Sequence, residues 1–208
     1  MKALILDCAR MKIDQLNAFR AFGELHSSLY AGEAEKDLEE FAPYLFHIPD
    51  GCQTQEHFLK TGKGLSWGIM LESACPFDKL KTHLRRFLRV KMESGETMYF
   101  RFYDPRVLRV FLPTCDSHQL VDFFGPITHF IMEDEDSHYY LRFSLKNQSL
   151  IKERFTIENF NTSPHSKENG TSEKEQFPDS AQTTLSPKKD AQDSARKNAP
   201  NNPNLWID

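Results

Sequence analysis

The sequence lacks any segment long and apolar enough to cross a membrane. A spanning helix needs about 18 consecutive apolar residues, and no run approaches that length. The apolar run at residues 3–6 is far shorter than the core of a signal peptide, and Asp7 ends it. No Cys-x-x-Cys pair occurs, and we expect the four widely spaced cysteines to be reduced thiols. These absences predict a cytoplasmic protein that makes no contact with a membrane.

An excess of positive charge is also missing. The formal net charge is -4 and the isoelectric point is near 6.1, whereas proteins that bind nucleic acid or anionic membranes rely on a basic field. We therefore expect protein partners and no nucleic acid. The outer face of a predicted helix near residue 85 is locally basic, and either an acidic protein surface or solvent can meet it. Its basic residues are Lys79, Lys81, Arg85, Arg86 and Arg89.

Sequence signatures of catalysis are absent as well. The chain has no Gly-x-Ser-x-Gly elbow, no His-Glu-x-x-His pair and no glycine-rich phosphate loop, so we expect no enzyme, no cofactor and no small-molecule substrate. The alternative is a small cytoplasmic hydrolase or transferase whose active site is dispersed along the sequence. Cys115 and His118 form a candidate nucleophile pair, but a half-buried thiol beside a surface histidine explains the same spacing.

The histidines and carboxylates near the end of the domain do not reach the spacing of metal ligands. His129 and His138 face each other across a predicted hairpin and form a candidate metal site with His118, but ordinary hairpin side chains account for them. Four carboxylates at residues 133–136 lack the alternating ligands and central glycine of a calcium loop. We expect a solvated hairpin turn and no metal.

Aromatic residues are almost absent from the last quarter of the chain. Phe177 and Trp206 are the only aromatics after residue 160, and polar residues dominate there. Such a segment buries too little apolar surface to offset an ordering cost of about 1–2 kcal/mol per residue. We therefore divide the chain into a folded domain at residues 1–157 and a disordered polar tail at residues 158–208.

The folded part contains short segments with the period of strands alternating with segments of helical period. Strands are predicted near residues 3–7, 44–48, 65–71, 97–103, 127–132 and 138–145, the last two forming a C-terminal β-hairpin. Helices lie between most of them. This pattern predicts a mixed α and β (α+β) domain. Two lobes meeting near residue 95 are an alternative to a single core.

The most specific segment is Tyr-Phe-Arg-Phe-Tyr-Asp-Pro-Arg-Val-Leu at residues 99–108. Asp104 is predicted to cap a helix and Pro105 to occupy its first position. The strand period places Phe100 and Phe102 on one face and Arg101 and Tyr103 on the other. We expect Arg101 or Arg106 to pair with a buried carboxylate.

This segment resembles the adaptor or chaperone domain of type VI secretion systems, a family also described as domain of unknown function 4123. The order of other phrases along the chain is similar too. These are the opening strand that ends in Asp7, Ala-Pro-Tyr-Leu at 42–45, Trp-Gly-Ile at 67–69, His-Leu-Arg at 83–85 and Phe-Phe-Gly-Pro-Ile at 123–127. The resemblance covers nearly all of residues 1–157.

The resemblance implies a non-catalytic protein that binds a toxin effector and helps load it onto the spike (VgrG-type) protein of the secretion apparatus. The family has no established catalytic residues to carry over. Candidate contacts with effector or spike are Arg101, Tyr103, Arg106, Arg85 and Arg86, whereas Phe100, Phe102, Asp104 and Pro105 are assigned a structural role. For the whole motif we favour the structural role over direct contact with the effector.

Overall fold

The computed structural model describes residues 1–30, 41–91, 94–159 and 175–176. The helices are α1 (Ile13–Ala21), α2 (Gln53–Thr61), α3 (Phe77–Arg85), α4 (Pro105–Phe111) and α5 (Ser117–Phe124). The first strands are β1 (Lys2–Asp7), β2 (His26–Ser28), β3 (Pro43–His47), β4 (Gly68–Ser73), β5 (Arg89–Lys91) and β6 (Thr97–Tyr99). The later strands are β7 (Ile127–Glu133), β8 (Tyr139–Lys146), β9 (Ser149–Thr156) and β10 (Glu175–Gln176). The fold is mixed α and β, as the sequence predicted.

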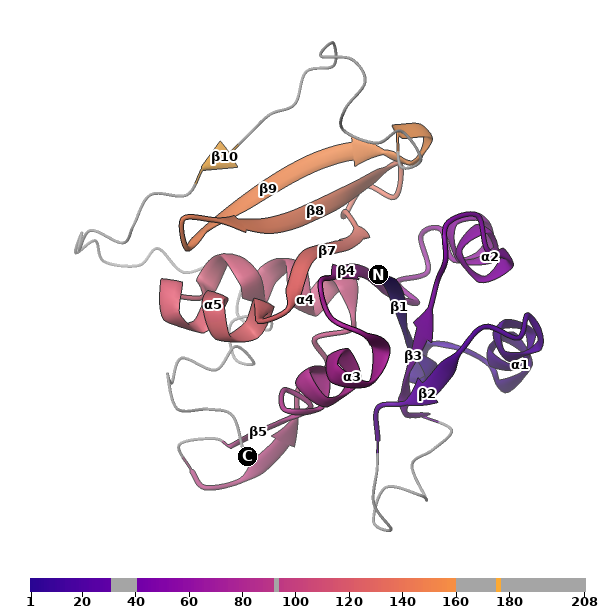
Figure 1. Ribbon diagram of the computed structural model, residues 1–208, viewed down its shortest axis with the longest axis horizontal. Helices are drawn as coiled ribbons and strands as arrows, with labels where there is room; N and C mark the ends of the chain where they lie inside the picture. The colour runs from indigo at the N-terminus through magenta and orange to yellow at the C-terminus, as the bar shows by residue number, and fades with distance from the viewer. Residues whose placement is uncertain (31–40, 92–93, 160–174, 177–208) are drawn as a thin grey trace, which may run out of the picture.

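Within the described residues, one eight-stranded sheet has the order β10-β9-β8-β7-β4-β1-β3-β2, and all of its pairs are antiparallel. The first strand of the chain, β1, therefore lies in the interior of the sheet between β3 and β4. The pairing of β4 with β7 joins the strands that precede residue 95 to those that follow it. A separate two-stranded hairpin, β5-β6, projects beside α3 (Figure 1).

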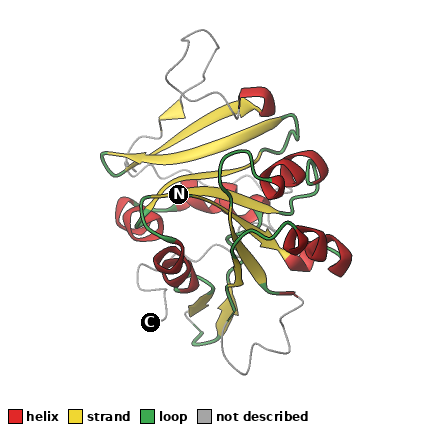
Figure 2. Cartoon of the chain, turned by 45° about the vertical axis from the view of Figure 1, so that its right-hand side comes forward, coloured by secondary structure: helices red, strands yellow, loops and turns green. Residues whose placement is uncertain are grey.

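Helices cover both faces of this sheet. Figure 1 shows α1 and α2 to the right of the central strands and α3, α4 and α5 to the left, and in Figure 2 helices lie on both sides of the strands. Alternate residues of β1 supply the two cores: Leu4 and Leu6 pack with the α1 and α2 side, and Ala3 and Ile5 pack with the α3–α5 side. A strand that is buried on both faces needs apolar side chains at every position, which explains why residues 3–6 are all apolar.

Close backbone contact, rather than hydrophobic pattern, fixes where β4 begins. The predicted strand at 65–71 was wrong at its start because Ser66 has a left-handed backbone (φ 52°) and belongs to the preceding turn. At Gly68 a Cβ atom would lie 1.9 Å from the carbonyl oxygen of Ile5 on β1. Only glycine allows β4 to approach β1 this closely.

Other boundaries follow from helix caps. Asp104 is the N-cap of α4 and accepts a hydrogen bond from the Arg106 amide, and Pro105 is the first residue of the helix, as predicted. Asp116 and Gln119 form a reciprocal capping box at the start of α5. Gly125, with φ of 47°, ends α5, and its Cα lies so close to the buried His83 ring that a side chain there would collide with the ring.

The predicted strand at 97–103 was wrong beyond Tyr99, because the strand ends there and a turn at residues 102–103 follows, closed by the Asp104 amide on the Arg101 carbonyl oxygen. The short strands β2 and β5 and the eight-residue β9 were not predicted. The predicted C-terminal hairpin is confirmed by the β7–β8 pairing. Apart from residues 158–159 and β10, which pairs with β9, the predicted disordered tail lies outside the described residues.

The expectation of a fully solvated turn at residues 133–136 was wrong for its first carboxylate. Glu133 is the last residue of β7 and is only 4% exposed. Its two oxygens accept hydrogen bonds from the amides of Gly64 (2.6 Å) and Ser66 (3.1 Å). Burial raises the pKa of Glu133, although these two amides oppose the rise. Glu133 therefore holds the turn before β4 against the end of β7.

Candidate functional site

The two phenylalanines of the motif belong to the core. Phe100 and Phe102 are 5% and 0% exposed. Both rings pack near Phe123 of α5, with centroid distances of 6.5 and 5.8 Å, and Phe100 also meets Phe111 of α4 at 4.7 Å. The predicted alternation does not extend to Tyr103, which is 2% exposed, because the turn directs Tyr103 inward as well. Three aromatic side chains thus fix the turn onto the helices.

Arg101 joins this turn to the end of β1. Its Nη2 donates a short hydrogen bond to Oδ2 of Asp7, whose side chain is fully buried, while the Arg101 side chain is 39% exposed. Burial raises the pKa of Asp7 even though the guanidinium beside it acts in the opposite direction. The charged pair links two segments that are 94 residues apart in sequence. The expectation that an arginine of the motif pairs with a buried carboxylate agrees with this contact.

Asp104 combines two tasks at the start of α4. Its Oδ1 accepts from the amide and the Nε of Arg106, both at 3.0 Å, and its Oδ2 accepts from Nη2 at 2.6 Å. Burial alone would raise the pKa of Asp104, but the hydrogen bonds and charge of Arg106 hold it below its usual value. The two-point contact fixes the plane of a guanidinium that is 45% exposed.

A row of tyrosines adjoins these arginines. Burial and the neighbouring Tyr30 hydroxyl raise the pKa of Tyr103, so Tyr103 stays neutral and serves as a hydrogen-bonding group. The Tyr30 ring contacts the Tyr99 ring at a centroid distance of 5.4 Å, and Tyr99 is 45% exposed. Tyrosines 99, 30 and 103 therefore form a continuous path from the surface to the buried part of the motif.

The other predicted contact residues lie on α3 and just after it. Arg85 and Arg86 are exposed, and Nη2 of Arg86 lies 3.3 Å from Oδ1 of Asp122 on α5. Lys81 donates to the hydroxyl of Ser27 on β2 at 2.6 Å. Part of this basic face is thus committed to contacts within the chain, whereas Arg85 has no ion pair among the described residues.

The Cys115 and His118 pair does not form a nucleophilic site in the structure. The Cys115 thiol donates to the carbonyl oxygen of Phe111 at 3.5 Å, and burial raises its pKa to about 12. A thiol with such a pKa stays protonated near neutral pH and is a poor nucleophile.

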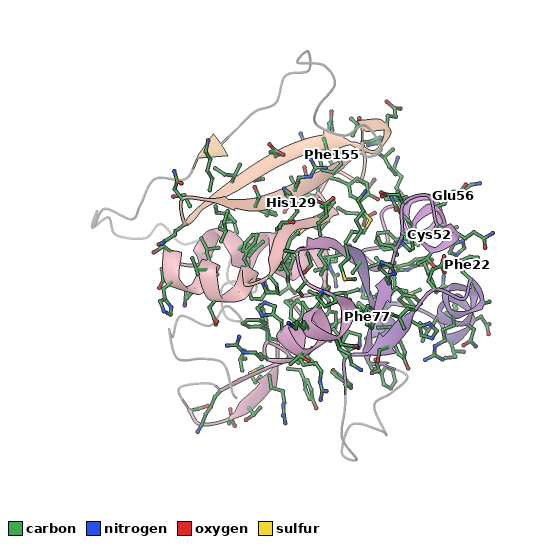
Figure 3. All side chains as sticks on the ribbon, viewed as in Figure 1. Phe22, Cys52, Glu56, Phe77, His129 and Phe155 are labelled. Atoms are coloured by element: carbon green, nitrogen blue, oxygen red, sulfur yellow. The ribbon has the colours of Figure 1, made fainter. Side chains whose placement is uncertain are left out.

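The histidines also lie apart. Nδ1 of His129 lies 2.9 Å from Oε2 of Glu72 on β4, and Nδ1 of His138 lies 2.7 Å from Oδ1 of Asp136. Figure 3 shows His129 on β7, and Cys52, the N-cap of α2, in a separate part of the molecule. Over the described ranges, no group of three or more His, Cys, Asp or Glu side chains is arranged to hold a metal ion.

Residues 4–122 match the family model described as a domain of unknown function (DUF4123). This chain belongs to the DUF4123 family. The matched part is more than half of the chain and contains both Asp7 and the motif that carries Arg101. The match ends within α5, so it is shorter than the resemblance seen in the sequence. Strand β7, which pairs with β4, lies beyond the matched residues. No curated protein and no solved structure matches the chain.

In this DUF4123 chain, sequence reasoning did not name Asp7 and Tyr30 as members of the candidate site. A signal was available for Asp7, because a carboxylate that directly ends a doubly buried apolar strand needs a partner. Tyr30 carried no comparable signal.

None of the helices within the described ranges has the length and apolar character of a membrane span.

Proposed function

We propose that this DUF4123 chain is a non-catalytic adaptor that binds a toxin effector in the bacterial cytoplasm. It helps to load the effector onto the spike (VgrG-type) protein of a type VI secretion system. The observation that carries the proposal is the motif around Arg101 and Arg106. It is the part of the family resemblance with the most specific sequence, and it holds two guanidinium groups rigidly at the surface.

The geometry of the motif suits recognition of a protein. Each arginine rests on a carboxylate that is almost completely buried, Asp7 or Asp104, so the guanidinium group is fixed before a partner arrives. A fixed side chain loses little rotamer freedom on binding, which favours affinity. Arginine and tyrosine are also the residue types that most often dominate the energy of protein interfaces.

Affinity capture tests this proposal directly. The full chain is tagged and expressed in its own bacterium, and retained proteins are identified by mass spectrometry. We expect a toxin encoded by a neighbouring gene and a spike protein in near-stoichiometric amounts. An unrelated acidic protein of similar size with the same tag serves as the control. The proposal is wrong if the chain retains neither protein although both are expressed.

A further inference from the structure

Five partly or fully exposed side chains lie in the motif or beside it. We call Tyr30, Arg89, Tyr99, Arg101 and Arg106 the tyrosine–arginine surface. Arg89 of β5 is the cross-strand partner of Tyr99 of β6, and Tyr99 contacts Tyr30. Tyr99, Arg101 and Arg106 belong to one short segment of the chain, and ion pairs with the buried Asp7 and Asp104 hold the two arginines there. The surface therefore connects the β5-β6 hairpin to the start of α4.

The arginines of this surface retain hydrogen-bonding capacity toward solvent. A guanidinium has five N–H donors, and Arg106 uses only Nε and Nη2 on Asp104. Arg101 uses Nη2 on Asp7, and 39% of its side chain is exposed. Arg89 is exposed on β5. The carboxylates that hold Arg101 and Arg106 are buried beneath them, so the outward side of the surface presents positive charge.

This local charge is opposite in sign to that of the whole chain, which is -4. A positive patch on an acidic protein attracts acidic partners selectively, because the rest of the protein repels them. The planar guanidinium groups match the geometry of carboxylates, and the exposed face of Tyr99 offers aromatic contact area. The surface therefore suits a segment that carries both carboxylates and aromatic rings.

We propose that the tyrosine–arginine surface binds an acidic segment of a protein partner, in which glutamate or aspartate side chains alternate with aromatic ones. The carboxylates pair with Arg89, Arg101 and Arg106, and an aromatic ring packs on Tyr99. The identification of this partner as the effector rests on the proposed function. The chemistry of the bound segment is inferred from the surface alone and does not depend on that function.

A defined polymer tests the chemistry without any effector. The full chain is titrated with a random copolymer of glutamate and tyrosine and, separately, with one of lysine and tyrosine, at about 150 mM salt. The test variant combines Arg89→Glu with Tyr99→Ser, two exposed positions outside the buried pairs, so we expect it to fold, and its circular dichroism spectrum checks this. The matched control is Lys60→Glu, a charge reversal at an exposed position of α2 on another side of the molecule.

We expect the double variant to bind the glutamate copolymer at least about tenfold more weakly than the unmodified chain. Lys60→Glu should change the dissociation constant by less than about twofold. Arg106→Gln should also weaken binding, and its circular dichroism spectrum reports whether it folds. Equal loss in the test and control variants, or equally tight binding of the lysine copolymer, would overturn the inference.

A second experiment repeats the affinity capture with the unmodified chain and with the double variant. If the unmodified chain retains its effector and the double variant retains it equally well, the inference is wrong and the proposed function stands. If no effector is retained but the copolymer binds in a variant-sensitive way, the proposed function is wrong and the surface is still an acidic-segment site. Hydrogen exchange of the bound effector should show protection in an acidic segment, and protection confined to basic or neutral segments contradicts the inference.

Discussion

The contact between Arg101 and Asp7 gives the sharpest test of how the motif is built. Removal of one partner from a fully buried ion pair costs about 3–5 kcal/mol, because the other charge is left without compensation. Asp7 is fully buried, but the Arg101 side chain is 39% exposed, so water screens the pair and can approach the carboxylate once Arg101 is shortened. We therefore expect Arg101→Ala to lower the free energy of unfolding by about 2–3 kcal/mol, at or below the lower end of that range.

The same substitution should depend on pH in a definite direction. Burial raises the folded-state pKa of Asp7 above its ordinary value of 3.8. A raised pKa means that the fold favours the protonated carboxyl. The stability linked to this group is therefore fully present below about pH 4 and is lost as pH rises through the folded pKa. Loss of Arg101 raises that pKa further, so the deficit of Arg101→Ala should be largest at neutral pH and should shrink on acidification.

Urea unfolding of the full chain at about pH 7 and about pH 5 measures both quantities. Arg85→Ala is the matched control, because Arg85 is exposed and should change stability by less than about 0.5 kcal/mol. A deficit of Arg101→Ala no larger than that of Arg85→Ala would show that the pair is not structural. A large deficit that stays constant with pH would show that Asp7 is not the group left uncompensated.

Three further substitutions probe other parts of the fold. Gly68→Ala should lower stability by more than about 3 kcal/mol, because its Cβ would lie 1.9 Å from the Ile5 carbonyl and the central strands would have to separate; the thermal midpoint measures this. Asp104→Ala should lower the free energy of unfolding by about 1–3 kcal/mol, because α4 loses its cap. Urea unfolding measures this, and an unchanged free energy would contradict the capping role. The hydrogen bond and charge of His129 lower the pKa of Glu72. The stability linked to Glu72 is therefore present above the ordinary pKa of 4.5 and is lost as pH falls through the folded pKa. His129→Gln should raise that pKa in a carbon-13 titration of Glu72.

Local signals in the sequence predicted the features that depend on neighbouring residues. The cap at Asp104 needs only a few adjacent residues, and this prediction was confirmed. The hairpin turn before β9 was missed because Gln148 adopts a left-handed backbone (φ 64°), which its residue type does not indicate. Without that turn the segment after residue 146 had no recognisable start as a strand.

Contacts between distant segments were less predictable. The sequence indicated that an arginine of the motif needs a buried carboxylate, but nothing in the spacing distinguished Asp7 from other acidic residues, because the two partners are 94 positions apart. Glu133 shows the same limit. Within a run of four carboxylates, only its position at the end of β7 and the two amides that it accepts from distinguish Glu133 from the three carboxylates that follow.

The interior position of β1 has a consequence for the order in which the chain folds. During synthesis the apolar residues 3–6 emerge before their partner strands, which end only at His47 and Ser73. Until both have emerged, β1 has unpaired edges and can pair with other chains. When the complete chain refolds, the β7–β8–β9 meander pairs neighbouring segments through short loops, so we expect it to form before the centre of the sheet. Substitutions that weaken the β1–β4 pairing should then slow folding and increase aggregation of newly made chains more than equally destabilising changes in the meander.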